Sequence, residues 1–237
     1  MTRRRWIADE VTNDRAALSG AHAAHLSRTL RARVGQEFEV ACGDVVRRAT
    51  VSSVNDERVE FELWEEVAAS AAVPVTLLLA VFKFDRMERA IEKCTELNVT
   101  AIVPVIARRT EKHLAQAAEK RAERWRRIAH EASEQARRVT TPEISDPLKL
   151  SEALDVAAEL RIVLAETERE AQLIDILREP ADVRSLALAI GPEGGWTADE
   201  LQLFDQAGWQ AASLGTTVLR AETAAIAALA IARAEVG

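Results

Sequence analysis

The chain has 237 residues, of which 48% are hydrophobic and 29% charged, a composition typical of a folded globular protein. Its net charge of -7, its lack of tyrosine and its small number of other aromatics argue against a uniformly basic nucleic-acid binder and against a base-stacking platform. No apolar run reaches the roughly 18 residues that span a bilayer, and the first residues, 1–6, are not followed by the apolar region of a secretory signal. Two cysteines, Cys42 and Cys94, make no disulfide framework, so we expect a cytoplasmic protein.

The first part of the chain is predicted to form a short helix followed by antiparallel strands. The helix is expected over residues 22–34, where Gly35 would end it. Alternating and β-branched runs predict strands over 37–41, 45–54 and 58–64. Short strands at this spacing are typical of a small barrel or sandwich.

A change of pattern follows a small-residue stretch over 68–74, which we interpret as a linker between domains at 1–70 and 74–237. Beyond it, strands alternate with helices, and this alternation predicts an α/β domain with a parallel sheet. Strands are expected over 75–82, 101–106, 160–165, 186–190 and 211–214, and helices over 85–97, 119–138, 197–207 and 222–236. Thr197 and Glu200 form a capping box at the start of the third of these helices.

The acidic total conceals an uneven distribution of charge. Residues 1–34 carry seven arginines and three acids, and residues 83–149 carry fifteen basic residues and eleven acids. Residues 150–237 have a net charge of -9. The basic segments are read either as ordinary solvated helix faces or as a basic surface held on an acidic body.

Several common enzyme motifs are missing from the sequence. The nine glycines form neither a dinucleotide fingerprint nor a phosphate-binding P-loop. The four histidines provide too few ligands for a zinc site, and there is no nucleophile elbow around a serine.

Two glycine-containing loops carry the strongest functional signal. Residues 190–197 (Ile-Gly-Pro-Glu-Gly-Gly-Trp-Thr) and residues 214–224 (Leu-Gly-Thr-Thr-Val-Leu-Arg-Ala-Glu-Thr-Ala) each follow a strand and lead into a helix. Bare backbone at the carboxyl end of a strand allows close approach of a ligand, so the two loops are candidates for two walls of one pocket. The alternative is that both are merely tight strand-to-helix connections.

Together with other segments, these loops resemble the RsmE family, the 16S rRNA (uracil-N3)-methyltransferases of the SPOUT superfamily. The resemblance runs in order along nearly the whole chain. Its remaining parts are Arg4-Arg5-Trp6, residues 22–31 with Val34-Gly35, the segment from Lys83 to Val99, Pro104 with Arg109, and residues 131–138 followed by Pro142-Glu143-Ile144. The chain departs from the family pattern at Asn98, Thr110, Thr217 and Ala221.

The resemblance implies a PUA-like β-barrel as the first, RNA-binding domain and a SPOUT methyltransferase domain with a deep C-terminal trefoil knot as the second, giving an α+β chain overall. It also implies a homodimer without a metal or a membrane partner. The cofactor would be S-adenosylmethionine, and the substrate N3 of one uridine in the decoding-region helix of 16S rRNA, in the small ribosomal subunit.

Site residues follow from combining this resemblance with the chemistry. Backbone of the two loops and of a third strand end would hold the cofactor: Ala165, Glu166, Ile190, Gly191, Pro192, Gly194, Gly195, Leu214, Gly215, Val218 and Leu219. Deprotonated uracil would be stabilised by an arginine fork, for which the candidates are Arg109 and Arg138 and then Arg220. Glu193 is a weaker candidate for the proton acceptor, and the expected phosphate contacts are Arg3, Arg4, Arg5, Arg28 and Arg31.

Three readings remain open for Arg220, Arg138 and the function as a whole. Arg220 could instead form a structural ion pair with Glu193 or Glu222, and Arg138 could be a surface charge on its helix. The protein could be a non-catalytic RNA-binding or ribosome-assembly factor, or a SPOUT methyltransferase of another RNA such as tRNA.

Overall fold

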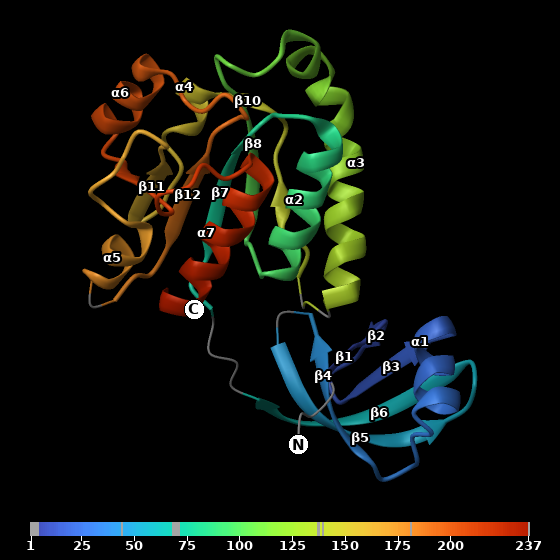
Figure 1. Ribbon diagram of the computed structural model, residues 1–237. Coiled ribbons are helices and arrows are strands. Elements are labelled where there is room, and N and C mark those ends of the chain that lie inside the picture. The colour runs from blue at the N-terminus through green and yellow to red at the C-terminus, as the bar shows by residue number, and fades with distance from the viewer. Residues whose placement is uncertain are drawn as a thin grey trace. The chain divides into compact units, whose positions relative to one another are not determined.

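The computed structural model describes residues 5–43, 45–67, 72–136, 138, 140–180 and 182–236. They belong to two compact units, one made of residues 1–71 with 137–140 and the other of 72–136 with 141–237. Figure 1 shows a first unit built mainly of strands and a second in which strands and helices alternate. The predicted linker falls largely on residues 68–71, which lie outside the described residues.

The first unit is a curled sheet of six strands in the order β1-β4-β5-β6-β3-β2. Its pairs are antiparallel except that β1 runs parallel to β4. The strands are β1 (Arg5–Ile7), β2 (Glu10–Val11), β3 (Arg15–Ser19), β4 (Glu37–Cys42), β5 (Val45–Val54) and β6 (Arg58–Val67). The three predicted strands are confirmed as β4, β5 and β6, whereas β1 to β3 were not predicted because they are short and lack a clear alternation.

Because the sheet curls, one short segment of chain reaches both of its edges. Ala8 donates its backbone N–H to Ala41 in β4 at 3.0 Å, and Asp9 donates to Ala17 in β3 at 2.9 Å. The segment from β1 to β2 therefore crosses from one edge to the other. The side chains on the inner face, among them Leu18 and Phe61, are fully buried and form the core of the unit.

The helix of the first unit is shorter than expected. It consists of α1 (Gly20–Ala24) and one π-helical turn over His25–Thr29. Arg31 adopts a φ of 51°, which lies in the left-handed region and cannot continue a helix. The prediction of a helix as far as residue 34 was therefore wrong.

The second unit is an entirely parallel sheet in the order β10-β8-β7-β12-β11-β13, with β9 also paired to β8. The predicted parallel α/β sheet is confirmed. The strands are β7 (Val75–Ala80), β8 (Ala101–Ile106), β9 (Glu143–Ile144), β10 (Leu148–Lys149), β11 (Leu160–Leu164), β12 (Leu186–Ile190) and β13 (Gln210–Ala212). Every residue of β12 is buried, as expected for a parallel strand covered on both faces.

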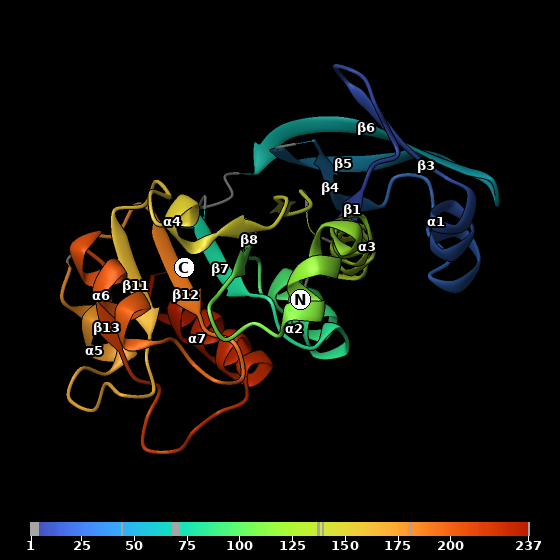
Figure 2. The same ribbon diagram turned by 90° about the horizontal axis from the view of Figure 1, so that it is seen from above.

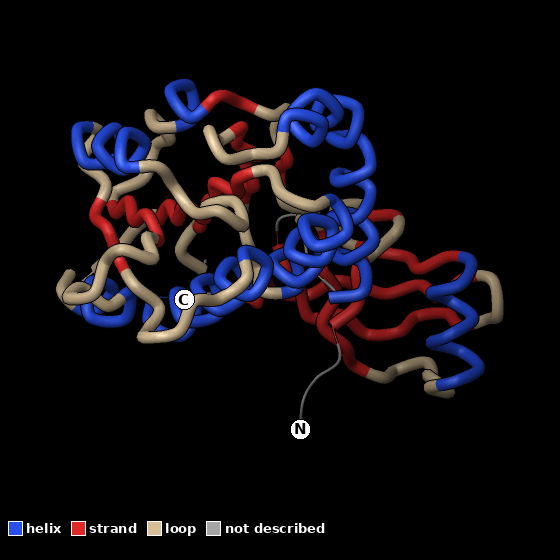
Figure 3. The backbone as a smooth tube through the Cα atoms, turned by 45° about the horizontal axis from the view of Figure 1, so that its top comes forward, coloured by secondary structure: helices blue, strands red, loops and turns tan. Residues whose placement is uncertain are grey.

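Helices lie on both faces of this sheet, as Figures 2 and 3 show. The helices are α2 (Phe84–Glu96), α3 (Lys112–Ala136), α4 (Leu150–Ala153), α5 (Leu173–Arg178), α6 (Ala198–Gln206) and α7 (Ala221–Val236). Leu77 and Leu79 of β7 belong to the core that packs against α2, α3, α5 and α7. Leu78 and Ala80 belong to the opposite core, against α4 and α6. Alternate residues of β7 therefore pack against different helical layers.

The ends of the helices depend on particular residues. Asn98, just past α2, has a φ of 65°, so it adopts the left-handed conformation that asparagine tolerates at a helix end. Thr197 caps α6, and the predicted capping box with Glu200 is confirmed. The helix α3 begins at Lys112 rather than at residue 119, and α4 and α5 were not predicted because they are only four and six residues long.

Candidate functional site

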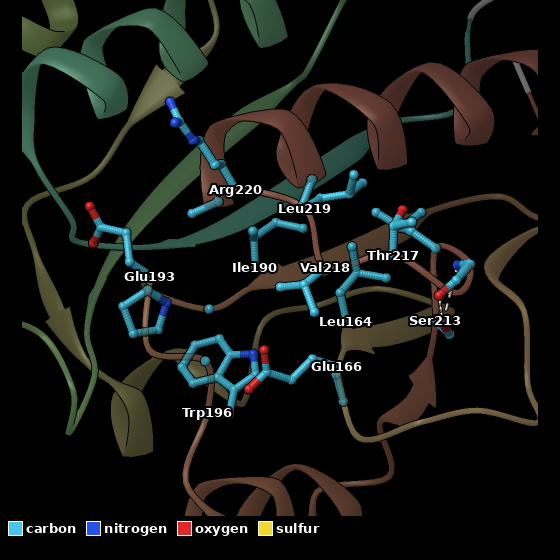
Figure 4. A pocket seen from close by; sticks show the side chains of 18 of the residues that line it. Leu164, Glu166, Ile190, Glu193, Trp196, Ser213, Thr217, Val218, Leu219 and Arg220 are labelled. Atoms are coloured by element: carbon cyan, nitrogen blue, oxygen red, sulfur yellow. Dashed lines mark hydrogen bonds between the residues drawn. The ribbon is translucent and has the colours of Figure 1, made fainter.

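A cavity of about 330 Å³ opens where three neighbouring parallel strands end. Its walls come from the chain that leaves β11, from residues 191–197 (the β12–α6 loop) and from residues 213–220 (the β13–α7 loop). The volume lies within the range of small-molecule sites, and the carboxyl edge of a parallel sheet is where α/β proteins bind ligands. Figure 4 shows the lining, with Glu193 and Arg220 toward one end and Ser213 and Thr217 toward the other.

The β12–α6 loop is built around a close approach between backbone and side chain. Gly195 donates to Pro192 O at 2.8 Å and has a φ of 69°, a conformation that favours glycine. A Cβ atom at Gly195 would stand 2.9 Å from Glu166 Oε1, and one at Gly191 would stand 3.2 Å from Trp196 Nε1. Side chains at these positions would therefore crowd Glu166 and Trp196.

Trp196 joins the β12–α6 loop to α6 by a ring contact. Its ring packs edge-on against Phe204 of α6, with a centroid separation of 4.9 Å. Its buried indole N–H has no hydrogen-bond partner among the residues that the structure describes. Trp196 therefore lines the cavity with an indole N–H that lacks a hydrogen bond in the described structure.

Arg109 fastens the β12–α6 loop to the chain that follows β8. Its guanidinium donates to the carbonyl oxygens of Gly194 and, at 3.4 Å, Trp196. A Cβ atom at Gly194 would lie 3.2 Å from Arg109 Cδ, so the arginine side chain rests on the bare backbone there. The next residue, Thr110, donates its buried hydroxyl to Val81 O at 2.9 Å, which anchors the same segment to the end of β7.

The β13–α7 loop closes the cavity from the other side. Ser213 Oγ accepts from Gly215 N at 3.2 Å and donates to Gly215 O at 3.1 Å, which forms a compact turn after β13. Val218 is 80% exposed although it is apolar and lines the cavity. The loop thus presents an uncovered apolar side chain above a polar turn.

Charged side chains gather where the cavity meets α2 and α7. Arg86, in the first turn of α2, lies 3.8 Å from Glu193 Oε1 and 3.9 Å from Glu222 Oε1. The side chain of Glu222 is only 12% exposed, and its Oε2 has no hydrogen-bond partner within the described part of the chain. Arg220 also lines the cavity, and no ion pair or hydrogen bond holds its guanidinium to another described residue.

The structure gathers most of the predicted cofactor residues around one cavity. Those that line it are Ala165, Glu166, Ile190, Gly191, Pro192, Gly195, Leu214, Gly215, Val218 and Leu219, together with Glu193 and Arg220. Gly194 lies instead beneath Arg109. Neither Arg109 nor Arg138 lines the cavity, and Arg138 belongs with residues 137–140 to the first unit.

The predicted phosphate contacts are only partly described. Arg3 and Arg4 lie outside the described residues, and of Arg5 the structure gives only the backbone. Arg28 is exposed and paired with Asp56 at 2.9 Å, and Arg31 is exposed as well.

Arg86 is the functional candidate that sequence reasoning missed. It follows β7, the neighbour of β12, and so stands at the same carboxyl edge as the two glycine loops. It lies six residues beyond the end of β7, in the first turn of α2, and no glycine loop marks the position in the sequence.

The described residues contain neither a membrane-spanning helix nor a group of metal ligands. No helix there is both long and apolar enough to cross a membrane. No group of three or more His, Cys, Asp or Glu side chains within those same residues is placed to hold a metal ion.

Comparison with known proteins first defines the class. Residues 69–233 match the model of the RNA methyltransferase domain. Ribosomal RNA small subunit methyltransferase E from Synechocystis is 32% identical over 94% of this chain and 74% of its own length. The protein of the same name from Rickettsia conorii is 30% identical over 93% of this chain and 90% of its own.

A solved structure agrees with the sequence matches. Ribosomal RNA small subunit methyltransferase E from Neisseria gonorrhoeae, bound to S-adenosylmethionine, superposes with a TM-score of 0.71. It is 31% identical and covers 95% of this chain and 94% of its own. This chain belongs to the ribosomal RNA small subunit methyltransferase E family.

Proposed function

We propose that this protein transfers a methyl group from S-adenosylmethionine to N3 of one uridine in the decoding-region helix of 16S rRNA, acting on the assembled small subunit. The observation that carries the proposal is the cavity of about 330 Å³ walled by the β12–α6 and β13–α7 loops, in a chain of this family. The family supports rRNA as the substrate class, and the bound cofactor of the Neisseria relative supports the choice of S-adenosylmethionine.

The residues of the cavity fit that cofactor. Apolar side chains, including Leu164, Ile190 and Leu219, offer a surface for a flat purine. The loops contribute backbone groups and the Glu166 carboxylate contributes acceptors, which suit hydroxyl and ammonium groups. A Cβ atom at Gly195 would displace the Glu166 carboxylate, which lines the same cavity.

When bound, S-adenosylmethionine supplies a methyl group attached to a positively charged sulfur. The chain must then hold uracil in line with that methyl and stabilise the negative charge that N3 and the ring oxygens gain on losing a proton. Arg220 is the guanidinium best placed for this role, because it lines the cavity and is not paired within the described residues. Glu193, at the same end of the cavity, is the candidate acceptor for the N3 proton.

Arg109 and Arg138 take other roles in this proposal. Arg109 positions the β12–α6 loop through the carbonyls of Gly194 and Trp196, so it acts on the reaction through the cofactor wall. Arg138 is assigned an RNA contact, because it belongs to the first unit, which is proposed to bind RNA, and does not line the cavity.

The first unit is proposed to be a PUA-like RNA-binding domain that includes residues 1–70. Its curled sheet supports this fold, and the exposed side chains of Arg28 and Arg31 are suited to phosphate contacts. The Arg28–Asp56 pair is solvent-exposed, so a phosphate can replace the carboxylate at little cost.

Two further parts of the proposal come from the family resemblance. The second unit, including residues 74–237, is proposed to carry a deep trefoil knot of the SPOUT type. The enzyme is proposed to act as a homodimer in the cytoplasm.

The proposal is tested by incubating small subunits from a strain that lacks this protein with the enzyme and methyl-labelled S-adenosylmethionine. The RNA is then digested to nucleosides and separated. We expect the label in 3-methyluridine of 16S rRNA. Label in another nucleoside, or in tRNA offered as competitor, would overturn the assigned substrate. A protein whose melting temperature S-adenosylmethionine does not raise would instead be a non-catalytic RNA-binding factor.

A further inference from the structure

Arg86 stands between the two carboxylates that could otherwise neutralise Arg220. Arg86 Nη1 lies 3.8 Å from Glu193 Oε1, and Arg86 Nε lies 3.9 Å from Glu222 Oε1. The same guanidinium therefore pairs with the β12–α6 loop on one side and with the first turn of α7 on the other. Glu222 follows Arg220 by two residues, and Glu193 lines the same cavity as Arg220.

The burial of these groups makes their pairing matter. The side chains of Arg86 and Glu193 are 30% and 31% exposed, and that of Glu222 is 12% exposed. Solvent therefore screens the charges only partly, and a buried carboxylate needs a cation or hydrogen bonds nearby. Arg86 is the cation within ion-pair distance of both carboxylates among the described residues.

We propose that Arg86 is a positioning residue that occupies Glu193 and Glu222 so that the guanidinium of Arg220 stays available to the substrate. This inference rests on the proposed role of Arg220 in methyl transfer. The contacts at 3.8 and 3.9 Å are ion pairs rather than hydrogen bonds, so they hold the carboxylates electrostatically. Without Arg86, one or both carboxylates would draw Arg220 into an ion pair, and the arginine would then be withdrawn from the uracil oxygens.

The test measures the effect of Arg86→Ala twice, once in the wild type and once in the Glu193→Gln, Glu222→Gln double variant, where the added change makes the triple variant. Single-turnover methyl transfer to small subunits is measured at saturating S-adenosylmethionine, and S-adenosylhomocysteine affinity is measured by calorimetry. Arg86→Ala should slow transfer about tenfold or more, as expected when a charge-stabilising group is lost, with cofactor affinity within about twofold of the wild type. In the double-variant background Arg86→Ala should change the rate by less than about twofold, since neither glutamine competes for Arg220. Any rate lost with the Glu193 carboxylate is common to both proteins of that pair.

Two controls separate this mechanism from simple unfolding. Arg86→Lys keeps the positive charge and should remain close to the wild-type rate. Arg89→Ala removes an exposed arginine of the same helix, outside the cavity lining, and should leave the rate unchanged. The melting temperature should fall in Arg86→Ala, because the two carboxylates lose their counter-charge. It should recover in the triple variant, because both carboxylates are replaced by neutral amides.

The outcomes are distinct. An equal slowing by Arg86→Ala in the two backgrounds, with Arg220→Ala also slow, would overturn the role assigned to Arg86, as would a wild-type rate in Arg86→Ala. Full activity in Arg220→Ala would instead overturn the catalytic assignment of Arg220 on which the proposed function relies.

Discussion

The carboxylate of Glu200 accepts a hydrogen bond from the backbone N–H of Arg108 at 2.7 Å. Glu200 lies in the first turn of α6, whereas Arg108 lies in the chain that leaves β8. The same carboxylate caps its own helix by accepting from the backbone N–H and hydroxyl of Thr197 at 2.8 and 2.9 Å. One side chain that is 2% exposed therefore joins the two segments that Arg109 also connects.

Glu200→Gln should destabilise the second unit, because an amide in place of the carboxylate weakens charge-assisted bonds and offers only one acceptor oxygen. We expect a loss of about 1–3 kcal/mol in the free energy of unfolding, measured by urea denaturation. The matched control is Glu152→Gln, which changes an exposed capping glutamate that accepts from Lys149 N at 2.9 Å. Equal losses in the two variants would contradict the importance given to the Arg108 contact.

Gly195→Ala should weaken cofactor binding as well as stability. The new methyl group would stand 2.9 Å from Glu166 Oε1, at a residue whose φ is 69°. The left-handed conformation alone costs about 1–2 kcal/mol, and Gly208→Ala, at a φ of 76° away from the cavity, should share that cost. Calorimetry should show reduced S-adenosylmethionine affinity only for Gly195→Ala; equal affinities in the two variants would reject the assignment of the cavity to the cofactor.

Cys94 should make stability depend on alkaline pH. Burial raises the pKa of its thiol to about 12, so folding favours the protonated form. The free energy of unfolding should then fall as pH rises from the ordinary thiol pKa toward 12, because the unfolded chain releases the proton first. Between pH 8 and pH 10.5 the wild type should lose about 2 kcal/mol more than Cys94→Ala. Parallel pH curves for the two proteins would show that the thiol ionises normally.

Arg138→Ala should abolish or strongly reduce methylation while cofactor affinity survives. The arginine does not line the cavity, so its loss leaves the cofactor walls intact. Calorimetry and methyl transfer are measured on the same preparation, with Arg127→Ala, an exposed arginine of α3, as control. A parallel fall in cofactor affinity would show that Arg138 supports the cavity instead of binding RNA.

The strands and the two loops were predictable because their signals are local. Strand β12 is a continuous apolar run, and the glycines that follow it predict a tight connection to a capped helix. The capping box was readable because its two residues lie three positions apart. Charge pairing between distant segments leaves no such signal, so neither the Arg86 cluster nor the Glu200–Arg108 bond could be predicted.

Some predictions failed or stay open for physical reasons. The strands β1 and β2 contribute only three and two residues and depend on pairing with β4 and β3, which no local pattern records. The expectation that Arg109 binds substrate stays a prediction; its guanidinium contacts two carbonyl oxygens of the β12–α6 loop, on which its proposed positioning role rests. Knotting and dimerisation are global properties and remain predictions.

The central claim, methylation of N3 of one uridine, is tested most directly by reverse transcription of 16S rRNA. Small subunits from a strain that lacks this protein are incubated with S-adenosylmethionine and either the wild-type enzyme or Arg220→Ala. A methyl group on N3 blocks Watson–Crick pairing, so the wild-type enzyme should produce one new stop, at a uridine of the decoding-region helix, and Arg220→Ala should produce little or none. A cDNA profile that is unchanged by the wild-type enzyme, or stops at a different kind of nucleotide, would contradict the account.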